Sequence, residues 1–260
     1  KDSPALVARM IEAVAKIGES EPNRPGMLLG RIQSGKTRAF IGIIARAFDE
    51  GFDFAIVLTK GTQALSEQTV KRITEDYKSA IADDKVRVYD IMKFPTNLRA
   101  FQLKQKIVIV AKKENKNLQR IMDALSRHYP DLKTKRLLIV DDEADFATLA
   151  FRKNKSTDVV EAGNIAKWID QLRAATNGAG YLQVTATPYS LYLQPDDEES
   201  NPLFHPIRPA FTVLLPLFDG YVGGDYFFGK ADEEDSPAQY AFKEVLTEEL
   251  EALKKEDNRR

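Results

Sequence analysis

Eight consecutive residues fit the pattern G-x-x-x-x-G-K-[ST], which describes a loop that folds around phosphate groups. The glycines let backbone N–H groups turn toward phosphate oxygens, the lysine neutralises the charge of the outer phosphates, and the last hydroxyl ligates magnesium. The residues of this phosphate loop are Gly30, Arg31, Ile32, Gln33, Ser34, Gly35, Lys36 and Thr37. We therefore expect the loop to hold a nucleoside triphosphate, with Lys36 on the phosphates and Thr37 on the metal.

A cluster of carboxylates follows an apolar run about a hundred residues later. Residues 137–140 are typical of a buried strand, and Asp141, Asp142 and Glu143 come directly after them. Carboxylates at such a strand end complete a magnesium site and orient the attacking water. We expect Asp142 to bind the metal, because Glu143 directly after it can then polarise the water. Asp141 is the alternative, since a shift of one residue turns a side chain to the other face of a strand.

Two threonines form the third candidate element. Thr185, Ala186 and Thr187 come directly after the apolar run 181–184. Hydroxyl groups at a strand end can hydrogen-bond the acidic residues and so report whether the outermost phosphate is present. An ordinary capped turn before Pro188 is the alternative.

The three motifs can meet only if the strands and helices around them form a suitable fold. Apolar runs of strand length alternate with helical patterns, which predicts an α/β fold with a mainly parallel sheet and helices on both faces. In such a fold the functional residues lie at the carboxyl ends of the strands. The expected strands are 27–29, 54–58, 86–89, 106–110, 137–140, 181–184 and 211–217. The expected helices are 4–17, 37–48, 62–77, about 118–125, 165–172 and 237–255.

Length and composition favour one main domain with an appendage. The chain has 260 residues and 43% hydrophobic content, which is enough for a full core. We expect a helix and linker over residues 1–26 and the main domain over 27–190. Residues 191–260 should hold an acidic loop, a strand, a segment rich in glycine and aromatics, and a polar helix.

Charge and cysteine content exclude several classes of protein. The net charge of -1 gives no bulk attraction to nucleic acid, so any such contact must be a local patch. The absence of cysteine excludes disulfides, thiolate zinc sites and cysteine nucleophiles. No apolar run has the length of a membrane span, and residues 1–4 lack the apolar segment of a signal peptide. We therefore expect a cytoplasmic chain without a membrane partner.

The order of these motifs resembles that of superfamily 2 helicases. Gly30 to Thr37, Asp142-Glu143-Ala144-Asp145 and Thr185-Ala186-Thr187 correspond to helicase motifs I, II and III, and Thr59-Lys60-Gly61-Thr62 falls at the place of motif Ia. The phrases GRIQSGKT, LLIVDDEAD and VTATPY are more narrowly similar to the Z-one domain family. Those are bacterial proteins labelled as candidate endonucleases and found with restriction and phage-defence genes. The resemblance covers residues 27–188.

The resemblance implies the first RecA-like domain of a DEAD-like helicase or translocase, with ATP and magnesium as cofactors. It assigns Lys36 to the phosphates, Thr37 and Asp142 to the metal, and catalysis to Glu143 with Lys36. It also implies nucleic-acid contacts from loops after the strands, with DNA rather than RNA as the expected partner. The candidates are Thr59, Lys60, Gly61, Lys112, Lys113 and Lys116, because contacts to phosphate use lysines, hydroxyls and backbone N–H groups. For the three later lysines, a solvated helix face is an equal alternative.

The chain also departs from the helicase pattern. The glutamine motif that selects adenine is not found before Gly30. A second RecA-like domain, with its arginines, would belong to a longer protein, so we expect weak hydrolysis from this chain alone. Defence-system proteins are further expected partners. Nuclease activity finds no support, because the carboxylates near Asp142 are already committed to the nucleotide site.

The sequence leaves three questions open: the function of the chain, the structure of one glycine-rich segment and the position of Trp168. The chain could be a nucleotide-gated switch or assembly module that recruits a protein without moving along nucleic acid. The segment Gly220–Gly229 could be a hinge or a platform that receives a second domain. It could also be a glycine-bearing hairpin with aromatics packed beneath it, which we slightly prefer. Trp168 has helical spacing with Ile165 and Leu172, which favours a core position over a base-stacking surface.

Overall fold

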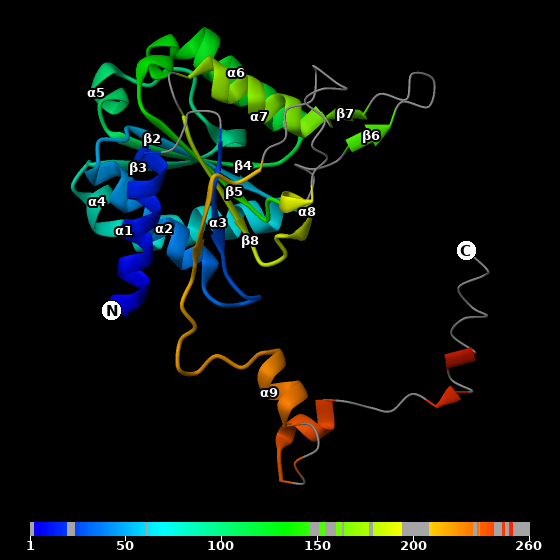
Figure 1. Cartoon of the computed structure of the whole chain (residues 1–260). Helices are drawn as coiled ribbons and strands as arrows, with labels where there is room; N and C mark the ends of the chain where they lie inside the picture. Colours follow the sequence, from blue (N-terminus) through cyan, green and yellow to red (C-terminus); the bar gives the residue numbers. More distant parts are fainter. Residues whose placement is uncertain are drawn as a thin grey trace. The chain divides into compact units, whose positions relative to one another are not determined.

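The structure is a computed structural model of the whole chain (Figure 1). It describes residues 3–19, 24–60, 62–145, 151–153, 160–162, 164–176, 179–193, 208–230, 233, 235–241, 246–247 and 250–251. The chain forms two compact units, Lys1–Pro216 and Leu217–Arg260.

The first unit is built on a seven-stranded sheet in the order β3-β4-β2-β5-β8-β1-β9, in which every neighbouring pair is parallel. The seven strands are β1 (Gly26–Leu29), β2 (Phe54–Thr59), β3 (Val86–Asp90), β4 (Lys106–Lys112), β5 (Leu137–Asp142), β8 (Gly180–Thr185) and β9 (Phe211–Leu214). The predicted mainly parallel α/β architecture is therefore confirmed. A separate antiparallel pair joins β6 (Phe151–Lys153) to β7 (Val160–Ala162).

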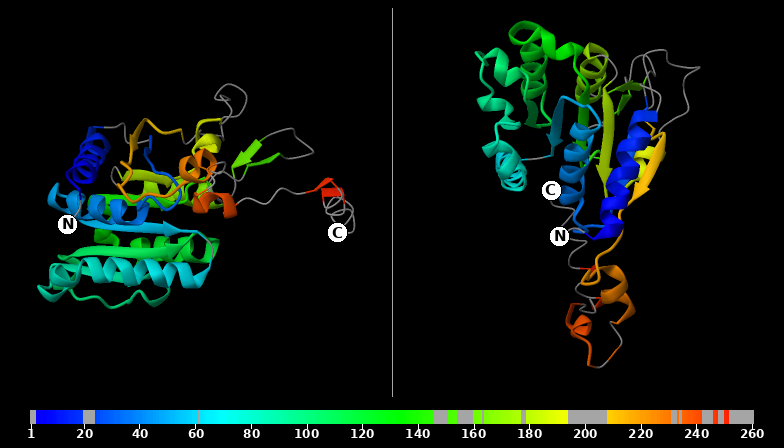
Figure 2. Two further views of the ribbon diagram at one scale, coloured as in Figure 1. Left: turned by 90° about the horizontal axis from the view of Figure 1, so that it is seen from below. Right: turned by 90° about the vertical axis from the view of Figure 1, so that its left-hand side faces the viewer.

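Helices lie on both sides of the main sheet (Figure 2). The α-helices of this unit are α1 (Pro4–Glu19), α2 (Lys36–Asp49), α3 (Gln63–Asp76), α4 (Lys78–Ala82), α5 (Ala100–Leu103), α6 (Asn115–Asp123), α7 (Asn164–Ala175) and α8 (Tyr189–Tyr192). Short turns of other helix types are η1 (Ile91–Lys93), η2 (Ala124–His128) and η3 (Pro130–Thr134). The sequence patterns did not reveal α4, α5 and α8, which are too short to show a helical period.

Two apolar cores, one on each face of the sheet, hold this unit together. Alternate residues of β2 separate the cores: Ala55 and Val57 pack with α1, α2 and α3, while Phe54, Ile56 and Leu58 pack with α6 and α7. Strands buried on both faces must be apolar at every position, which explains the near-continuous apolar runs in the sequence. The sheet is therefore a rigid platform whose carboxyl edge carries the loops described below.

The first unit extends further along the chain than predicted. We expected the main domain to end near residue 190, yet β9 pairs in parallel with β1 and α1 packs against α2. Leu215 continues this pairing, because its N–H donates to the carbonyl of Leu29 at 2.8 Å. The pairing of β9 thus covers the edge of β1, and the compact unit reaches Pro216.

The second unit contains α9 (Gly224–Gly229) and the 3-10 turn η4 (Pro237–Ala241). The hairpin that we preferred for Gly220–Gly229 is wrong, since the structure forms a short helix there. Phe228 in this helix is 74% exposed, so the aromatics are not all packed beneath the backbone. Of the polar helix expected over 237–255, the start is η4, and much of the rest lies outside the described residues.

Two classes of feature are absent from the described part of the chain. None of its helices combines the length and the apolar character that a membrane crossing requires. Nor do three or more of its His, Asp or Glu side chains gather in a group suited to a metal ion.

Candidate functional site

The phosphate loop joins β1 to α2 at the carboxyl edge of the sheet. Its turn depends on backbone conformations that few residues adopt: Gly35 has φ 87° and Gln33 has φ 61°. Gly30 has no room for a side chain, because a Cβ atom there would lie 2.6 Å from Oγ of Ser34. The glycines of the pattern are therefore required by the shape of the loop, as the sequence predicted.

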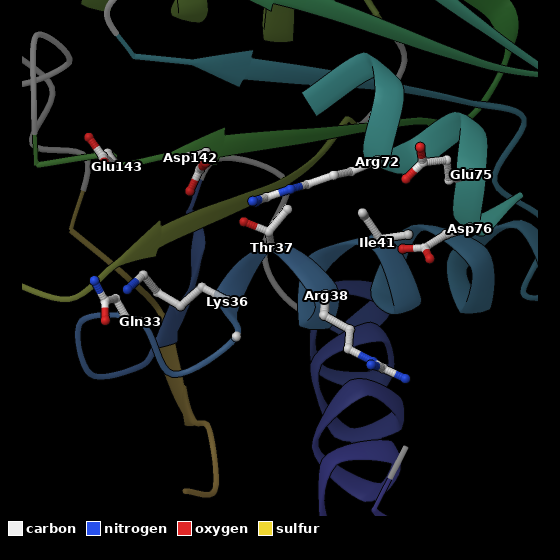
Figure 3. A pocket seen from close by; sticks show the side chains of 11 residues that line it. Gln33, Lys36, Thr37, Arg38, Ile41, Arg72, Glu75, Asp76, Asp142 and Glu143 are labelled. Carbon is white, nitrogen blue, oxygen red and sulfur yellow. The ribbon is translucent and has the colours of Figure 1, made fainter. Parts of the chain in front are cut away.

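A cavity of about 530 Å³ opens beside this loop (Figure 3). The loop and α2 contribute one side, α3 contributes a second side, and the carboxyl end of β5 contributes the third. The lining residues are Gln33, Gly35, Lys36, Thr37, Arg38, Ile41, Arg72, Glu75, Asp76, Asp142 and Glu143. The two predicted clusters, separated by about a hundred residues in the sequence, therefore meet in one cavity whose volume suits a nucleotide.

Lys36 is held inside its own loop. Its Nζ donates to the carbonyl oxygens of Arg31 at 3.0 Å and Gly30 at 3.4 Å. Burial lowers the pKa of Lys36, while the charges of Asp142, Glu143 and Asp145 act in the opposite direction. A partly desolvated ammonium whose hydrogen-bond partners are neutral carbonyls is well prepared for an anion.

Ser34 gives independent support for an anion site. It is a buried residue, and its Oγ has no hydrogen-bond partner among the described residues. A buried hydroxyl without a partner is costly in a folded protein and is expected where a ligand supplies the missing bond. The loop therefore fits a bound phosphate group better than it fits solvent.

The structure separates the two neighbouring aspartates at the end of β5. Asp141 is fully buried, where its Oδ1 lies 2.8 Å from Nζ of Lys113 and its Oδ2 accepts a bond of 2.9 Å from the Tyr181 hydroxyl. Asp142 lines the cavity, and its carboxylate accepts no hydrogen bond within the described residues. Of the two candidates, Asp142 lines the cavity and Asp141 does not.

The surroundings of Asp142 disfavour the ionised form of its carboxyl group. Burial, together with the nearby charge of Glu143, raises the pKa of Asp142 from its ordinary value of 3.8 to about 6, against the opposing effect of Lys113. Such a shift means that ionising Asp142 costs more free energy in the folded protein than in the unfolded chain, and a cation beside the carboxylate would reduce this cost. A perturbed carboxyl in a cavity is typical of a functional site.

Replacing Asp142 with asparagine should therefore stabilise the protein without metal at neutral pH. The folded form binds a proton more tightly than the unfolded form between pH 3.8 and about 6, so Asp142 lowers stability as pH rises through this window. We expect Asp142→Asn to gain about 1–2 kcal/mol above pH 6, after discounting for solvent contact, and the gain to vanish near pH 4. Thermal unfolding in EDTA across this pH range measures it. Asp76→Asn, at an exposed position of the same cavity, is the control, and a gain that is independent of pH would contradict this account.

Glu143 lies next to Asp142 with a strained backbone. Its φ is 52°, a conformation that non-glycine residues rarely adopt. Its carboxylate Oε2 lies 3.1 Å from Nζ of Lys60, which follows the end of β2, and both side chains are exposed. An exposed ion pair contributes only about 0–1 kcal/mol, so a ligand at the cavity can displace it.

The threonine element meets the acidic cluster as predicted. Oγ1 of Thr185 donates to Asp145 at 2.7 Å, and Oγ1 of Thr187 donates to the same carboxylate at 2.6 Å. Burial raises the pKa of Asp145, but the bonds from Thr187 and Thr185 outweigh it and hold the pKa below its ordinary value. The end of β8 is thereby tied to the segment after β5, and the predicted hydrogen bonds are confirmed.

Two of the predicted nucleic-acid contacts are corrected by their burial. The Lys113 side chain is 1% exposed, and its Nζ also donates to the carbonyls of Asp142 and Glu143, each at 2.8 Å. Thr59 is 2% exposed and its Oγ1 is buried. Neither group can reach a nucleic-acid backbone from this position. Lys113 instead holds the end of β5 in place.

The remaining candidates lie nearer the surface. Lys60 pairs with Glu143, Lys112 pairs with Glu114 at 2.6 Å, and Lys116 is exposed on the first turn of α6. Gly61 lies outside the described residues. The role of these three lysines as nucleic-acid contacts stays a prediction.

Arg72 is a cavity residue that the motifs did not reveal. Figure 3 shows its side chain extending from α3 toward Asp142 and Thr37. It is exposed and forms no hydrogen bond or ion pair with the described residues. No sequence signal marks it, because α3 reaches the cavity only through packing. Its guanidinium is a further cation of the cavity lining, in addition to Lys36 and Arg38.

Comparison with known proteins supports the fold alone. No protein-family model and no curated protein matches this chain. A similar solved structure is a nuclease-deletion mutant of the Type ISP restriction-modification enzyme LlaGI in complex with a DNA substrate mimic, with a TM-score of 0.50 and 12% identity. The match covers 90% of this chain but only 23% of that one. At this identity the similarity shows a common α/β fold, consistent with a RecA-like domain, and the assignment to the Z-one family stays a prediction.

Proposed function

We propose that this chain binds ATP with magnesium and acts as the first motor domain of a nucleic-acid-dependent ATPase of the helicase or translocase type, in a bacterial restriction or phage-defence protein. The observation that carries the proposal is the meeting of Lys36, Thr37, Asp142 and Glu143 around one cavity. The similarity in fold to a restriction-modification enzyme in complex with a DNA substrate mimic also supports it.

Each residue of the site has a role that follows from its position. The backbone N–H groups of the phosphate loop, Lys36 and the Ser34 hydroxyl would hold phosphate oxygens. Thr37 and Asp142 would hold magnesium, which supplies charge neutralisation when bound. Glu143 would accept a proton from the attacking water, once its carboxylate leaves Lys60.

The link between Asp145 and the two threonines suits a signal of nucleotide state. Thr185 ends β8, and the N–H of Gly30 donates to its carbonyl at 3.1 Å, so the phosphate loop and the threonine element share this strand end. A shift of the loop on nucleotide binding would therefore reach Asp145 through hydroxyl bonds. Lys60, Lys112 and Lys116 on the same edge are the proposed contacts to a DNA backbone.

Lys36→Ala tests the nucleotide site. We expect the affinity for ATP in magnesium to fall by about 10- to 100-fold, because charge-assisted hydrogen bonds to the phosphates are lost. Isothermal titration calorimetry of the wild type and the variant measures this change. The matched control is Lys104→Ala, an exposed lysine located before β4 and hence near the opposite edge of the sheet. Equal affinities for wild type and Lys36→Ala would remove the phosphate loop from nucleotide binding.

The nucleic-acid part of the proposal needs a separate measurement. ATP turnover by this chain with and without single-stranded or double-stranded DNA, at two salt concentrations, distinguishes a motor from a nucleotide-gated switch. DNA binding or stimulation of turnover supports the motor. ATP binding with neither effect, in a chain that includes its partner domain, would favour the switch.

A further inference from the structure

A second cavity, of about 400 Å³, lies between α6 and α7. Its lining consists of Asn115, Lys116, Gln119, Arg120 and Trp168. Trp168 is half-buried, since part of its ring packs against the core below α7 while the rest faces the cavity. The prediction of Trp168 as a core residue is therefore only partly right, and an aromatic surface is open to a flat ligand.

The charges around this groove have one sign. Lys116 and Arg120 lie one helical turn apart on α6, and no carboxylate lines the cavity. Lys116 makes no hydrogen bond or ion pair with the described residues, and Arg120 bonds the neutral Asn117 at 2.7 Å. The nearby acids are already engaged: Glu114 pairs with Lys112, and Asp170 pairs with Arg173. The groove thus complements an anion that also carries an apolar, flat group.

The groove lies toward the same edge of the sheet as the nucleotide site. α6 begins directly after β4, so Lys116 and Arg120 belong to its first two turns at the carboxyl edge. α7 leads into the start of β8, so the first half of this helix lies toward the carboxyl edge of the sheet. Trp168 is in its second turn and therefore belongs to this half. Figure 1 shows α6 and α7 side by side, in agreement with their contact.

We infer that this groove binds an unstacked base of single-stranded nucleic acid, with Trp168 as the stacking surface and Lys116 and Arg120 on the adjoining phosphates. The inference rests on the nucleic-acid part of the proposed function and adds to it a base-binding position. Stacking on an aromatic ring accepts any base, while lysine and arginine follow the backbone. A protein ligand with an acidic and aromatic segment would fit the same charges less specifically, because it carries no regular alternation of phosphates and rings.

The chain offers a direct reporter, because Trp168 is its only tryptophan. Titration of the wild type with oligothymidylate of about 12 nucleotides should quench the tryptophan fluorescence to saturation. An abasic strand of equal length has the phosphates without the bases, and it should bind weakly and quench little. Trp168→Ala should weaken oligothymidylate binding by about 10- to 100-fold, measured by anisotropy of a labelled strand, whereas Trp168→Phe should keep most of the affinity.

Lysine variants distinguish phosphate binding at this groove from nonspecific electrostatic attraction to the rest of the surface. Lys116→Ala should lower the slope of log affinity against log salt by about one unit. Lys78→Ala, an exposed lysine on α4 on the other face of the sheet, should leave the slope unchanged. Thermal unfolding of each variant shows whether it is folded. The quenching of the wild type tests the inference even if a variant does not fold.

Several outcomes would overturn the inference. Binding of oligothymidylate without quenching, equal quenching by the abasic strand, or quenching by an acidic aromatic peptide but not by the oligonucleotide each removes the base from the groove. If Lys36→Ala still lowers the affinity for ATP in these cases, the nucleotide site of the proposed function is unaffected. If the folded wild type binds neither ATP nor the oligonucleotide, the proposed function itself is rejected.

Discussion

We expect Glu143→Gln to keep the proposed affinity for ATP and magnesium and to reduce turnover by about 10²- to 10⁴-fold, the range expected when a general base is removed. Glutamine has nearly the shape of glutamate, but it cannot take the proton of the attacking water. Asp142 and Lys36 remain in place, so binding persists. The measurement is single-turnover hydrolysis with enzyme in excess. This format detects hydrolysis even when turnover is slow.

Two comparisons make this result specific. Glu75→Gln changes another carboxylate of the same cavity, on α3, and should leave turnover within about a factor of three. Lys60→Ala removes the ion pair to Glu143 and should not imitate the loss. Unchanged turnover in Glu143→Gln would take Glu143 out of the chemistry, and a parallel loss of ATP affinity would indicate a binding role instead.

We expect Lys113→Ala to lower the free energy of unfolding by about 3–5 kcal/mol, which is the typical cost of leaving one partner of a buried ion pair alone. The side chains of Lys113 and Asp141 are 1% and 0% exposed. Without the ammonium, Asp141 is a buried charge, and the carbonyls of Asp142 and Glu143 lose a donor as well. Urea unfolding measures the change, with the slope of the transition checked for constancy.

The neighbouring lysine is a matched control. Lys112 is the last residue of β4, directly before Lys113, and forms a partly exposed pair with Glu114, so Lys112→Ala should cost only about 0–1 kcal/mol. The double variant Lys113→Met with Asp141→Asn removes both charges and should recover much of the loss. If Lys113→Ala unfolds like the wild type while its DNA affinity falls, Lys113 is a surface contact and its buried placement is wrong.

The local parts of the site were predictable from the sequence. The phosphate loop needs Gly30 for a close approach and Gly35 for a positive φ, and both requirements concern only a few adjacent residues. The alternation of apolar runs and helices gave the parallel sheet, because each buried strand must be apolar at every position. The hydrogen bonds from Thr185 and Thr187 to an acidic residue followed from the common edge at which parallel strands end.

Side-chain direction was the main source of error. Lys112 and Lys113 have the same side chain, yet they differ in burial. Lys112 is the last residue of β4, whose register is fixed by β2, and Lys113 follows the strand. The Lys113 side chain turns inward to Asp141, and Thr59 is also buried. A run of basic residues at a strand end does not reveal which of them faces solvent.

The sequence alone determined that this chain contains a phosphate loop, an acidic strand end and a parallel α/β sheet, since these depend on short segments with strict local geometry. The tertiary structure decided which side chains meet. It placed Asp142 rather than Asp141 on the cavity, brought Arg72 to the loop from α3, and opened the groove at Trp168. The direction of each side chain depends on strand register and on helix packing between distant segments. The energies of these contacts are spread over the whole core, so no single residue of the sequence reveals them.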